Sequence, residues 1–323
     1  MTRKLGEGGI LVTGGAGFIG SHVVDALHAA GQRVHVLDNL STGRESNIPP
    51  EVALHSGDIR SKEAVATAIH EAQADVIVHC AAQTSVERSM NDPKYDRDVN
   101  ETGTQVLLDA ARQASTRRFV FISSGGAIYG ETGEPATEET PPSPGNFYGT
   151  HKLLAEKRVQ AAGLSFAILR PSNVYGPRQR SDAEGGVLAI FSERIAHNLP
   201  VEIHGDGRQV RDFLYVSDLV DAVKLAISYT EDVVWNVGSG VATPILDAAV
   251  VLGEQLGVAP QLVFRPRRAG DVDKSLVSPA LIASTGRWGP PVPLRAGLQR
   301  LTKHLVMSPA REASGGGRVQ LQP

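Results

Sequence analysis

A glycine-rich turn at residues 10–20 constrains the fold more than any other feature of this sequence. The segment reads Ile-Leu-Val-Thr-Gly-Gly-Ala-Gly-Phe-Ile-Gly, with glycines at 14, 17 and 20. An apolar run leads into the turn and a helical pattern leaves it, which is the setting of a turn that binds the pyrophosphate of a dinucleotide. Gly14 would permit the tight turn, Gly17 the approach of backbone amides to phosphate, and Gly20 close packing of helix on strand. The sequence therefore predicts a dinucleotide site near its start.

The acidic residue Asp38 predicts which dinucleotide binds. It ends the second β-rich run, in the segment Leu-Asp-Asn-Leu-Ser. A carboxylate there can accept hydrogen bonds from both hydroxyls of an adenosine ribose, and it would repel a 2′-phosphate. NAD is therefore favoured over NADP. Asp58 and Ile59, after the third run, are placed to cap the adenine, although a simple turn aspartate is an equally good interpretation of Asp58.

Short β-rich runs alternate with helical patterns through the first half of the chain. We expect strands at 10–13, 33–37, 52–56, 76–80, 118–123 and 165–169. We expect helices near 18–30, 61–72, 97–114 and 148–162. Several strands are continuously apolar, as strands are when helices cover both faces of a parallel sheet. The βαβαβ order predicts an α/β fold with a Rossmann-type, doubly wound parallel sheet.

The alternation loosens after about residue 170, which suggests a second, smaller part. Turns rich in Pro and Gly separate short helices expected at 184–196, 217–228 and 244–256. We predict a cofactor-binding domain over 1–170 and a substrate-binding part over 171–307. The two are expected to interleave, because a strand at 233–237 could still join the main sheet. The tail 308–323 contains Ser-Gly-Gly-Gly and is predicted to be disordered.

Charge and hydropathy exclude several classes of protein. The 323 residues carry a net charge of −3, so no basic surface calls for nucleic acid or an anionic membrane. No apolar run approaches the ~18 residues of a membrane span, and the N-terminus lacks the apolar stretch of a signal peptide. A cytoplasmic protein without a metal site is expected. The single cysteine, Cys80, lies in an apolar run and is predicted to be a buried hydrophobe rather than a reactive thiol.

Tyr148 and Lys152 form the candidate catalytic pair. They are four residues apart, so a helix would place both on one face. A free tyrosine has a pKa of ~10, and as a base it needs help from its surroundings. The lysine ammonium and the positive charge of a nearby nicotinamide would favour the tyrosinate. Lys152 could also hold the nicotinamide ribose. The alternative is an ordinary amphipathic helix.

Five segments together resemble the extended short-chain dehydrogenase/reductase family. They are Thr13-Gly-Gly-Ala-Gly-Phe-Ile-Gly20, Asp38-Asn-Leu, Ser123-Ser-Gly-Gly-Ala-Ile-Tyr-Gly130, Tyr148-x-x-x-Lys152 and Arg170-Pro-Ser-Asn-Val-Tyr-Gly-Pro177. Within this family, residues 8–305 most resemble the UDP-glucose 4-epimerases. The resemblance implies NAD-dependent 4-epimerisation of a UDP-hexose. Tyr148 would take the proton of the sugar 4-hydroxyl while C4 gives a hydride to NAD⁺, and the hydride would return to the other face of the 4-keto sugar.

The sequence departs from the family pattern before the Tyr-Gly dipeptide 129–130. The family has a Ser or Thr four residues before that tyrosine, to hydrogen-bond the 4-oxygen, but this chain has Gly125. Ser124 or Ser123 must substitute, and we favour Ser124; the alternative is that both serines only end the strand. The related 4,6-dehydratases carry an Asp-Glu pair where this chain has Gly126 and Ala127, which cannot move a proton.

The resemblance also implies residues that contact the two ligands. The cofactor is expected to contact Gly14, Gly17, Phe18, Ile19, Gly20, Asp38, Asn39, Ser41, Thr42, Gly43, Asp58, Ile59, Cys80, Ala81, Ala82, Gln83, Asn100, Tyr148 and Lys152. The UDP-sugar is expected to contact Ser85, Ser124, Tyr148, Asn173, Val187, His204, Arg211, Arg268 and Asp271. Arg211 and Arg268 would bind phosphate as planar multi-donor groups, and Asp271 the uridine ribose. Taken alone, each arginine could equally be a solvated surface charge.

Several alternatives stay open at the level of sequence. Another enzyme of the same architecture would be a UDP-GlcNAc or UDP-glucuronate 4-epimerase, or, with less support, a 4,6-dehydratase or ketoreductase. A non-catalytic NAD-binding sensor is a further possibility, although sensors of this fold usually lose the tyrosine and lysine that remain here. In similar proteins, helices equivalent to 97–114 and 148–162 form a dimer interface, so a homodimer is expected.

Overall fold

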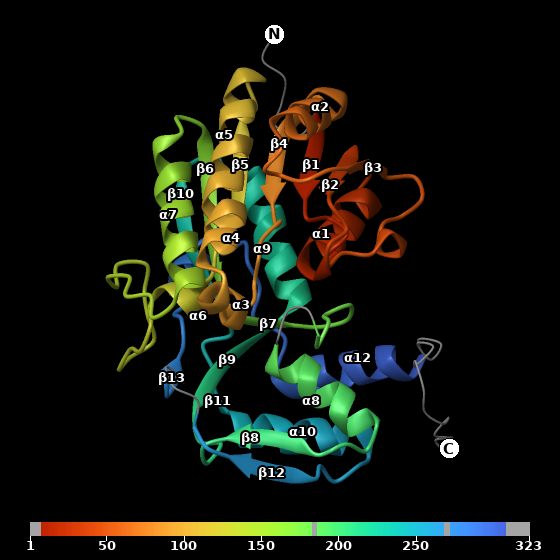
Figure 1. Cartoon of the computed structure of the whole chain (residues 1–323), viewed down its shortest axis with the longest axis vertical. Helices are drawn as coiled ribbons and strands as arrows, with labels where there is room; N and C mark the ends of the chain where they lie inside the picture. Colours follow the sequence, from red (N-terminus) through yellow and green to blue (C-terminus); the bar gives the residue numbers. More distant parts are fainter. Residues whose placement is uncertain (1–7, 183–185, 268–271, 308–323) are drawn as a thin grey trace.

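The computed structural model describes residues 8–182, 186–267 and 272–307, and a parallel sheet forms its centre (Figure 1). The strand order is β10-β6-β5-β4-β1-β2-β3. These strands are β1 Gly9–Thr13, β2 Val34–Asp38, β3 Ala53–Ser56, β4 Ala74–His79, β5 Arg118–Ile122, β6 Ser165–Pro171 and β10 Val233–Val237. The order reverses direction between β1 and β4, as it does in a doubly wound sheet. The predicted fold class is confirmed.

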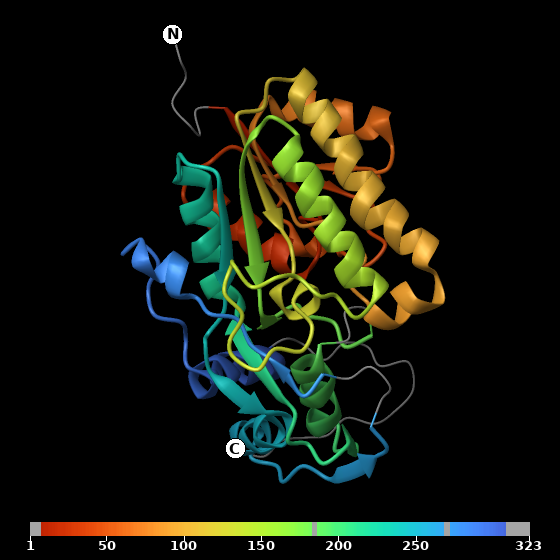
Figure 2. The same ribbon diagram turned by 90° about the vertical axis from the view of Figure 1, so that its left-hand side faces the viewer.

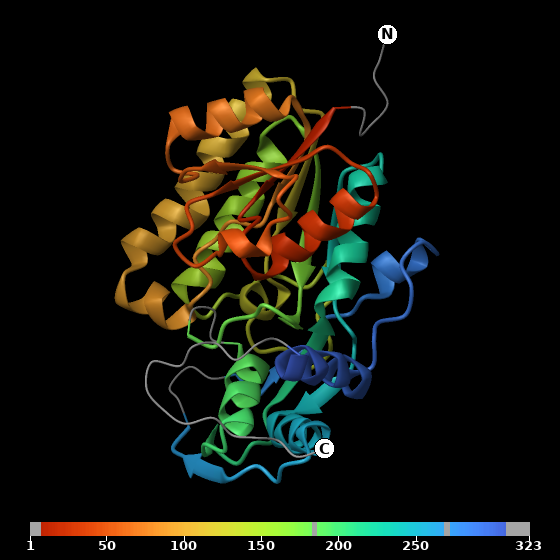
Figure 3. The same ribbon diagram turned by 90° about the vertical axis from the view of Figure 1, so that its right-hand side faces the viewer.

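Helices cover both faces of this sheet (Figures 2 and 3). One layer holds α1 Phe18–Ala29 and α9 Val216–Ser228, and the other holds α2 Lys62–Ala72, α5 Thr104–Gln113 and α7 Phe147–Ala161. Strand β1 shows why a continuous apolar run is needed. Ile10 and Val12 belong to the core beneath α1 and α9, whereas Leu11 belongs to the core beneath α2, α5 and α7. Successive side chains thus enter opposite cores.

Polar side chains cap the first turns of helices α3 Val86–Asn91, α4 Pro93–Arg97 and α7 and so fix where they begin. The side chain of Asn146 accepts from the amide of Gly149 (2.8 Å) and so starts α7. Ser85 and Asp92 cap α3 and α4 in the same way, and Pro93 occupies the first turn of α4. The carboxyl end of β5 is followed by the short α6 Gly125–Ile128, and η1 Glu45–Asn47 follows β2.

The single helix expected over 97–114 is interrupted at its start. Residues Asp98–Gly103 form a wider π-helical turn, η2, and α5 begins only at Thr104. Side chains within this turn are committed elsewhere: Asn100 bonds the backbone of Gln83, and Glu101 bonds Arg158. A β-carbon on Gly103 would come within 2.8 Å of Ile59, so the turn packs closely against that side chain. These contacts accompany the departure from α-helical geometry, which is common near functional sites.

The second part of the chain lies beyond the carboxyl ends of the sheet strands (Figure 1). Its strands are β7 Asn173–Tyr175, β8 Val201–His204, β9 Val210–Tyr215, β11 Ala242–Pro244, β12 Leu262–Arg265 and β13 Lys274–Ser275. Its helices are α8 Val187–Ala196, α10 Ile245–Leu256 and α12 Leu294–Met307. A separate apolar core holds them together, with Phe191, Leu252 and Leu298 at its centre. The tail 308–323 lies outside the described residues.

A strand from the later part of the chain joins the main sheet. Strand β10 pairs in parallel with β6, with Trp235 opposite Leu169, so the chain returns to the main sheet after β9 and α9. The short helix α11 Ala280–Ser284 contacts β10. In the described part of the chain, none of the helices is both long enough and apolar enough to span a membrane.

Candidate active site

A cavity of about 620 Å³ lies between the carboxyl ends of the sheet strands and the second part of the chain. Most of the predicted cofactor-binding residues line it. They are Gly14, Gly17, Phe18, Ile19, Gly20, Asp38, Asn39, Ser41, Thr42, Asp58, Ile59, Cys80, Ala81, Ala82, Gln83, Tyr148 and Lys152. The cavity spans the point where the strand order reverses, which is where ligands bind in open α/β sheets.

The glycine turn has the close contacts that the sequence implied. Gly14 has a φ of 68°, and a β-carbon there would lie 2.6 Å from the amide nitrogen of Ala81. A β-carbon on Gly20 would lie 2.1 Å from the Gly14 carbonyl oxygen. Gly17 caps α1 without a side chain, so the N-terminus of that helix stays open to the cavity. An exposed helix N-terminus suits a pyrophosphate.

Asp38 is positioned for a ribose at the end of β2. Its carboxylate accepts from the amides of Ala16 (2.9 Å) and Leu40 (2.8 Å), one on each oxygen, and each oxygen keeps a second lone pair. Burial raises the pKa of Asp38, and these two amides oppose that shift. Asp58 also lines the cavity, but its oxygens are held by Arg60 and Asn39, and the Arg60 hydrogen bonds keep its pKa well below the usual range. The residues present fit NAD.

Tyr148, Lys152 and Ser124 converge on the same cavity. Tyr148 and Lys152 lie in the first turns of α7, and Ser124 lies just after β5. The Ser124 hydroxyl hydrogen-bonds the Tyr148 phenol, and it makes no capping bond to α6. The Lys152 ammonium donates to the carbonyl oxygen of Ile122 (2.6 Å) and lies 4.3 Å from the centre of the Phe121 ring. The end of β5 therefore positions both catalytic candidates.

Burial dominates the pKa of Tyr148 in the protein on its own. Burial raises the pKa of Tyr148 to about 12, whereas we expected the lysine ammonium to stabilise the tyrosinate. Lys152 donates to the Ile122 carbonyl, and burial lowers its own pKa to about 8. The combined effect of Lys152 and a bound nicotinamide on Tyr148 stays a prediction. A further positive charge beside Tyr148 is needed to make it a base near neutral pH.

The structure explains why glycine replaces the family serine at 125. A β-carbon on Gly125 would lie 2.8 Å from Val277 and 2.9 Å from the carbonyl oxygen of Arg170. No side chain fits there. Gly126 is different, because a β-carbon on it would meet nothing closer than Ser275, at 3.8 Å, with Asn173 at 4.0 Å. The hydroxyl nearest to Tyr148 consequently comes from Ser124.

Some of the predicted substrate residues line the cavity and others do not. Ser85, Asn173 and Val187 line the cavity beside the catalytic pair. His204 and Arg211 are not among the described residues that line it, and their contact with the substrate stays a prediction. His204 lies on β8 near the Pro266 carbonyl, and the Arg211 guanidinium donates to the carbonyls of Val210 and Val272. Arg268 and Asp271 lie outside the described residues.

Two predicted cofactor residues act behind the cavity wall rather than in it. Gly43 packs against Ala16, where a β-carbon would come within 2.8 Å of the alanine side chain. Asn100 is 2% exposed, and its amide group bonds the backbone of Gln83 at both ends. Both residues therefore support the loops that line the cavity, and their direct contact with the cofactor stays a prediction.

Sequence reasoning missed several polar residues at the cavity. Arg88 and Tyr95 line it together, with the guanidinium 4.0 Å from the ring centre. Arg180 and Asp182 line it on the side of the second part, and Arg180 donates to the Thr42 carbonyl (3.1 Å). No spacing in the sequence marks these contacts, because they join segments more than 100 residues apart or short helices with no motif.

Comparison with known proteins finds UDP-glucose 4-epimerases that are similar to this chain over most of its length. A putative UDP-glucose 4-epimerase of Methanocaldococcus jannaschii is 38% identical over 297 residues, covering 90% of this chain and 96% of that protein. The structure of a Thermus thermophilus UDP-glucose 4-epimerase in complex with NAD has a TM-score of 0.88 and 41% identity, covering 93% of this chain and 99% of that one.

A Thermotoga maritima UDP-glucose 4-epimerase solved with UDP-glucose is similar to the same extent. Its TM-score is 0.89 at 38% identity, covering 92% of this chain and 98% of that one. A family model also matches residues 10–238, which include the glycine turn, Tyr148 and Lys152. The chain belongs to the NAD dependent epimerase/dehydratase family.

Proposed function

We propose that the protein interconverts UDP-glucose and UDP-galactose by epimerisation at C4. The observation that carries this proposal is the convergence of Ser124, Tyr148 and Lys152 on a cavity that also holds a complete NAD-binding turn. Similarity to UDP-glucose 4-epimerases over nine tenths of the chain supports it. Incubation with a panel of UDP-sugars, followed by chromatography of the products, tests it. Conversion of another UDP-sugar in place of these two would contradict it.

The cofactor is NAD, which when bound would supply a reversible acceptor for the hydride of C4. Gly14, Gly17 and the first turn of α1 would hold the pyrophosphate, and Asp38 the adenosine ribose. Lys152 would bind the nicotinamide ribose. The protein must also exclude water from the keto intermediate, which the position of the cavity between the two parts favours.

Tyr148 and Ser124 divide the work at the sugar 4-oxygen. The phenol oxygen of Tyr148 takes and returns the 4-hydroxyl proton, and the Ser124 hydroxyl hydrogen-bonds the same oxygen. Positive charge at the nicotinamide and at Lys152 would lower the raised pKa of Tyr148 toward the working range. A dehydratase would need a further acid and base, but Gly126 and Ala127 supply neither.

We expect the protein to purify with NAD(H) bound and without added cofactor. The cofactor is regenerated in each turnover, so nothing in the reaction requires its release. Denaturation followed by chromatography of the supernatant identifies the nucleotide. Recovery of NADP(H) without NAD(H) would contradict the assigned role of Asp38.

Ser124→Ala is expected to lower kcat more than Ser123→Ala. Both serines line the cavity. They follow the last residue of β5, Ile122, so the alternation of side chains along a strand does not place them on opposite faces. Only Ser124 bonds Tyr148, whereas the Ser123 hydroxyl is buried without a side-chain partner. Loss of such a hydrogen bond costs about 10²–10³-fold when it acts in the transition state. Equal, small effects in steady-state kinetics would show that another group holds the 4-oxygen.

We also propose that the pocket accepts an N-acetyl group on the sugar. In similar epimerases a bulky tyrosine at the position of Ser275 restricts the enzyme to unsubstituted hexoses. Here Ser275 faces the open side of Gly126, next to Asn173. Ser275→Tyr is therefore expected to lower kcat/KM for UDP-GlcNAc while kcat/KM for UDP-glucose stays within a few fold, because added bulk in a closed pocket is rejected. Absence of any UDP-GlcNAc turnover by the wild type would refute this.

We propose that the protein forms a homodimer through α5 and α7. A groove of about 340 Å³ between these helices is lined by Leu154 and Ala161, with Arg112 and Lys157 around them. Apolar residues with a charged rim suit a protein interface. Light scattering after size-exclusion chromatography gives the mass directly. The cytoplasmic location expected from the sequence stays a prediction.

A further inference from the structure

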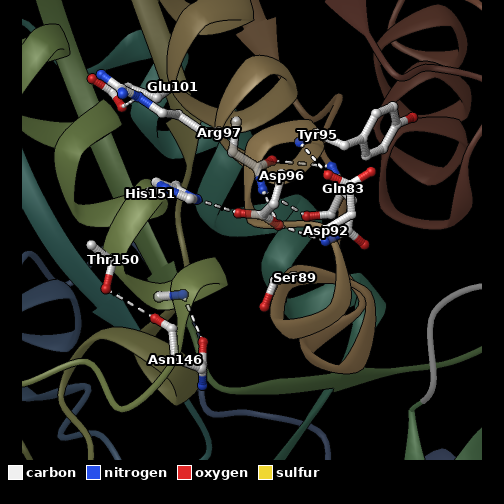
Figure 4. A network of polar contacts seen from close by, with 12 residues as sticks. Gln83, Ser89, Asp92, Tyr95, Asp96, Arg97, Glu101, Asn146, Thr150 and His151 are labelled. Atoms are coloured by element: carbon white, nitrogen blue, oxygen red, sulfur yellow. Dashed lines mark hydrogen bonds and ion pairs between the residues drawn. The ribbon is translucent and has the colours of Figure 1, made fainter.

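A buried cluster of polar side chains lies between α4 and α7, the helix that carries Tyr148 and Lys152 (Figure 4). At its centre is Asp96, which is 0% exposed. One carboxylate oxygen accepts from Gln83 Nε2 (2.5 Å) and Asn100 Nδ2 (3.1 Å), and the other accepts from His151 Nδ1 (2.6 Å). Three donors directed at one carboxyl group are the arrangement of an ionised aspartate. His151 therefore carries its proton on Nδ1.

This cluster connects two elements that line the cavity: the Gln83–Ser85 loop and helix α7. His151 lies on α7, three residues after Tyr148 and one before Lys152. On the other side, the Gln83 amide group makes two bonds to Ser85: Nε2 donates to the Ser85 carbonyl (2.9 Å), and Oε1 accepts from the Ser85 amide (2.6 Å). Gln83 and Ser85 both line the cavity. Asp96 is the link between this loop and the catalytic helix.

The charge of Asp96 also acts on the catalytic residues. It opposes formation of the tyrosinate at Tyr148 and favours the ammonium of Lys152. The His151 donor offsets this charge on the side of α7. Other titratable groups nearby are Glu156 and Cys80, which also act on Lys152, and Glu101, whose carboxylate is bonded by arginines on α4 and α7. The carboxylate of Glu156 is paired with Arg170. Substitution of Asp96 or His151 would therefore change the electrostatic potential at Tyr148.

We propose that Asp96 and His151 are a positioning pair for the proton transfer at Tyr148. The pair holds the Gln83–Ser85 loop against α7, and its charge balance governs the ionisation of the base. Neither residue touches the substrate; both act through Tyr148 and the loop. The inference rests on the proposed function in so far as Tyr148 is the base.

Three variants separate a positioning role from a structural one. His151→Ala removes the donor and leaves the charge of Asp96 less compensated, so the acidic limb of the kcat profile should move up by about one pH unit. At pH values on that limb, kcat should fall about tenfold while KM stays within a few fold. His151→Asn keeps a donor in the place of Nδ1 and should restore both. Asp96→Asn removes the charge and should move the limb to lower pH.

The decisive result is that His151→Ala and Asp96→Asn move the acidic limb of the kcat profile in opposite directions. His197→Ala, at the end of α8, is the control for loss of a histidine elsewhere. The variants are also titrated as purified, with tyrosinate followed by ultraviolet difference spectra and the Tyr148→Phe spectrum subtracted. This second readout needs no turnover, so it still tests the pair if the panel of UDP-sugars contradicts the proposed function.

Shifts in the same direction, or no shift in either variant, would overturn the proposal. If Asp96→Asn does not fold, the comparison of His151→Ala with His151→Asn decides. An upward shift in the alanine variant alone supports the pair, and identical titrations of the two variants overturn it.

Discussion

Tyr148→Phe is expected to lower kcat by about 10²–10⁴-fold, the usual cost of removing a general base. The substitution deletes one oxygen and leaves the ring, so the start of α7 and its Asn146 cap should stay intact. Because Lys152 is held by the Ile122 carbonyl and not by Tyr148, cofactor binding should also persist. Steady-state kinetics in both directions, with circular dichroism and NAD content, measure the three effects.

Tyr229→Phe is the matched control for this prediction. Tyr229 packs on Trp235 at the end of α9 and does not line the cavity, so the same loss of a hydroxyl should leave kcat unchanged. Epimerisation by Tyr148→Phe at near the wild-type rate would remove Tyr148 from the mechanism. Loss of NAD together with activity would instead assign it a binding role.

Gly125→Ala is expected to destabilise the protein by about 1–3 kcal/mol and to reduce activity. The added β-carbon would lie 2.8 Å from Val277 and 2.9 Å from the backbone oxygen of Arg170. Overpacking of this kind is relieved only by backbone movement. The movement would displace Ser124, the neighbouring residue, from Tyr148. Urea denaturation and kcat measure the two consequences.

Gly126→Ala is the matched control, because its β-carbon would meet nothing closer than 3.8 Å. We expect it to unfold at nearly the wild-type urea concentration. Equal midpoints for the two alanine variants would contradict the account of position 125. So would wild-type stability and activity in Gly125→Ser, which restores the residue that the family usually has.

The parts of the fold that could be predicted are those in which neighbours in sequence fix the conformation. The turn from Gly14 to Gly20 is one example, since its glycines are needed by contacts within the turn and with the adjacent β4 strand end. The alternating burial of β1 is another. The departure at Gly125 was also visible in the sequence, but the reason for it was not, because Val277 lies 152 residues away.

The parts that could not be predicted depend on where a long side chain points. Arg211 has the position in sequence of a phosphate ligand, yet it bonds the carbonyls of Val210 and Val272. Asn100 lies in the segment expected to be a helix over 97–114, but the π-helical turn η2 directs its amide to Gln83. The Asp96–His151 pair joins α4 and α7 across 55 residues with no motif to mark it. Such directions are set by packing between elements.

The central claim is that C4 is inverted by removal and return of its own hydrogen. The measurement is conversion of UDP-galactose deuterated at C4, by the protein as purified and without added cofactor. The product is analysed by NMR and mass spectrometry. The account predicts UDP-glucose that keeps its deuterium at C4, because the hydride never exchanges with water. Product with solvent hydrogen at C4 would contradict it, since inversion would then proceed by proton removal from carbon.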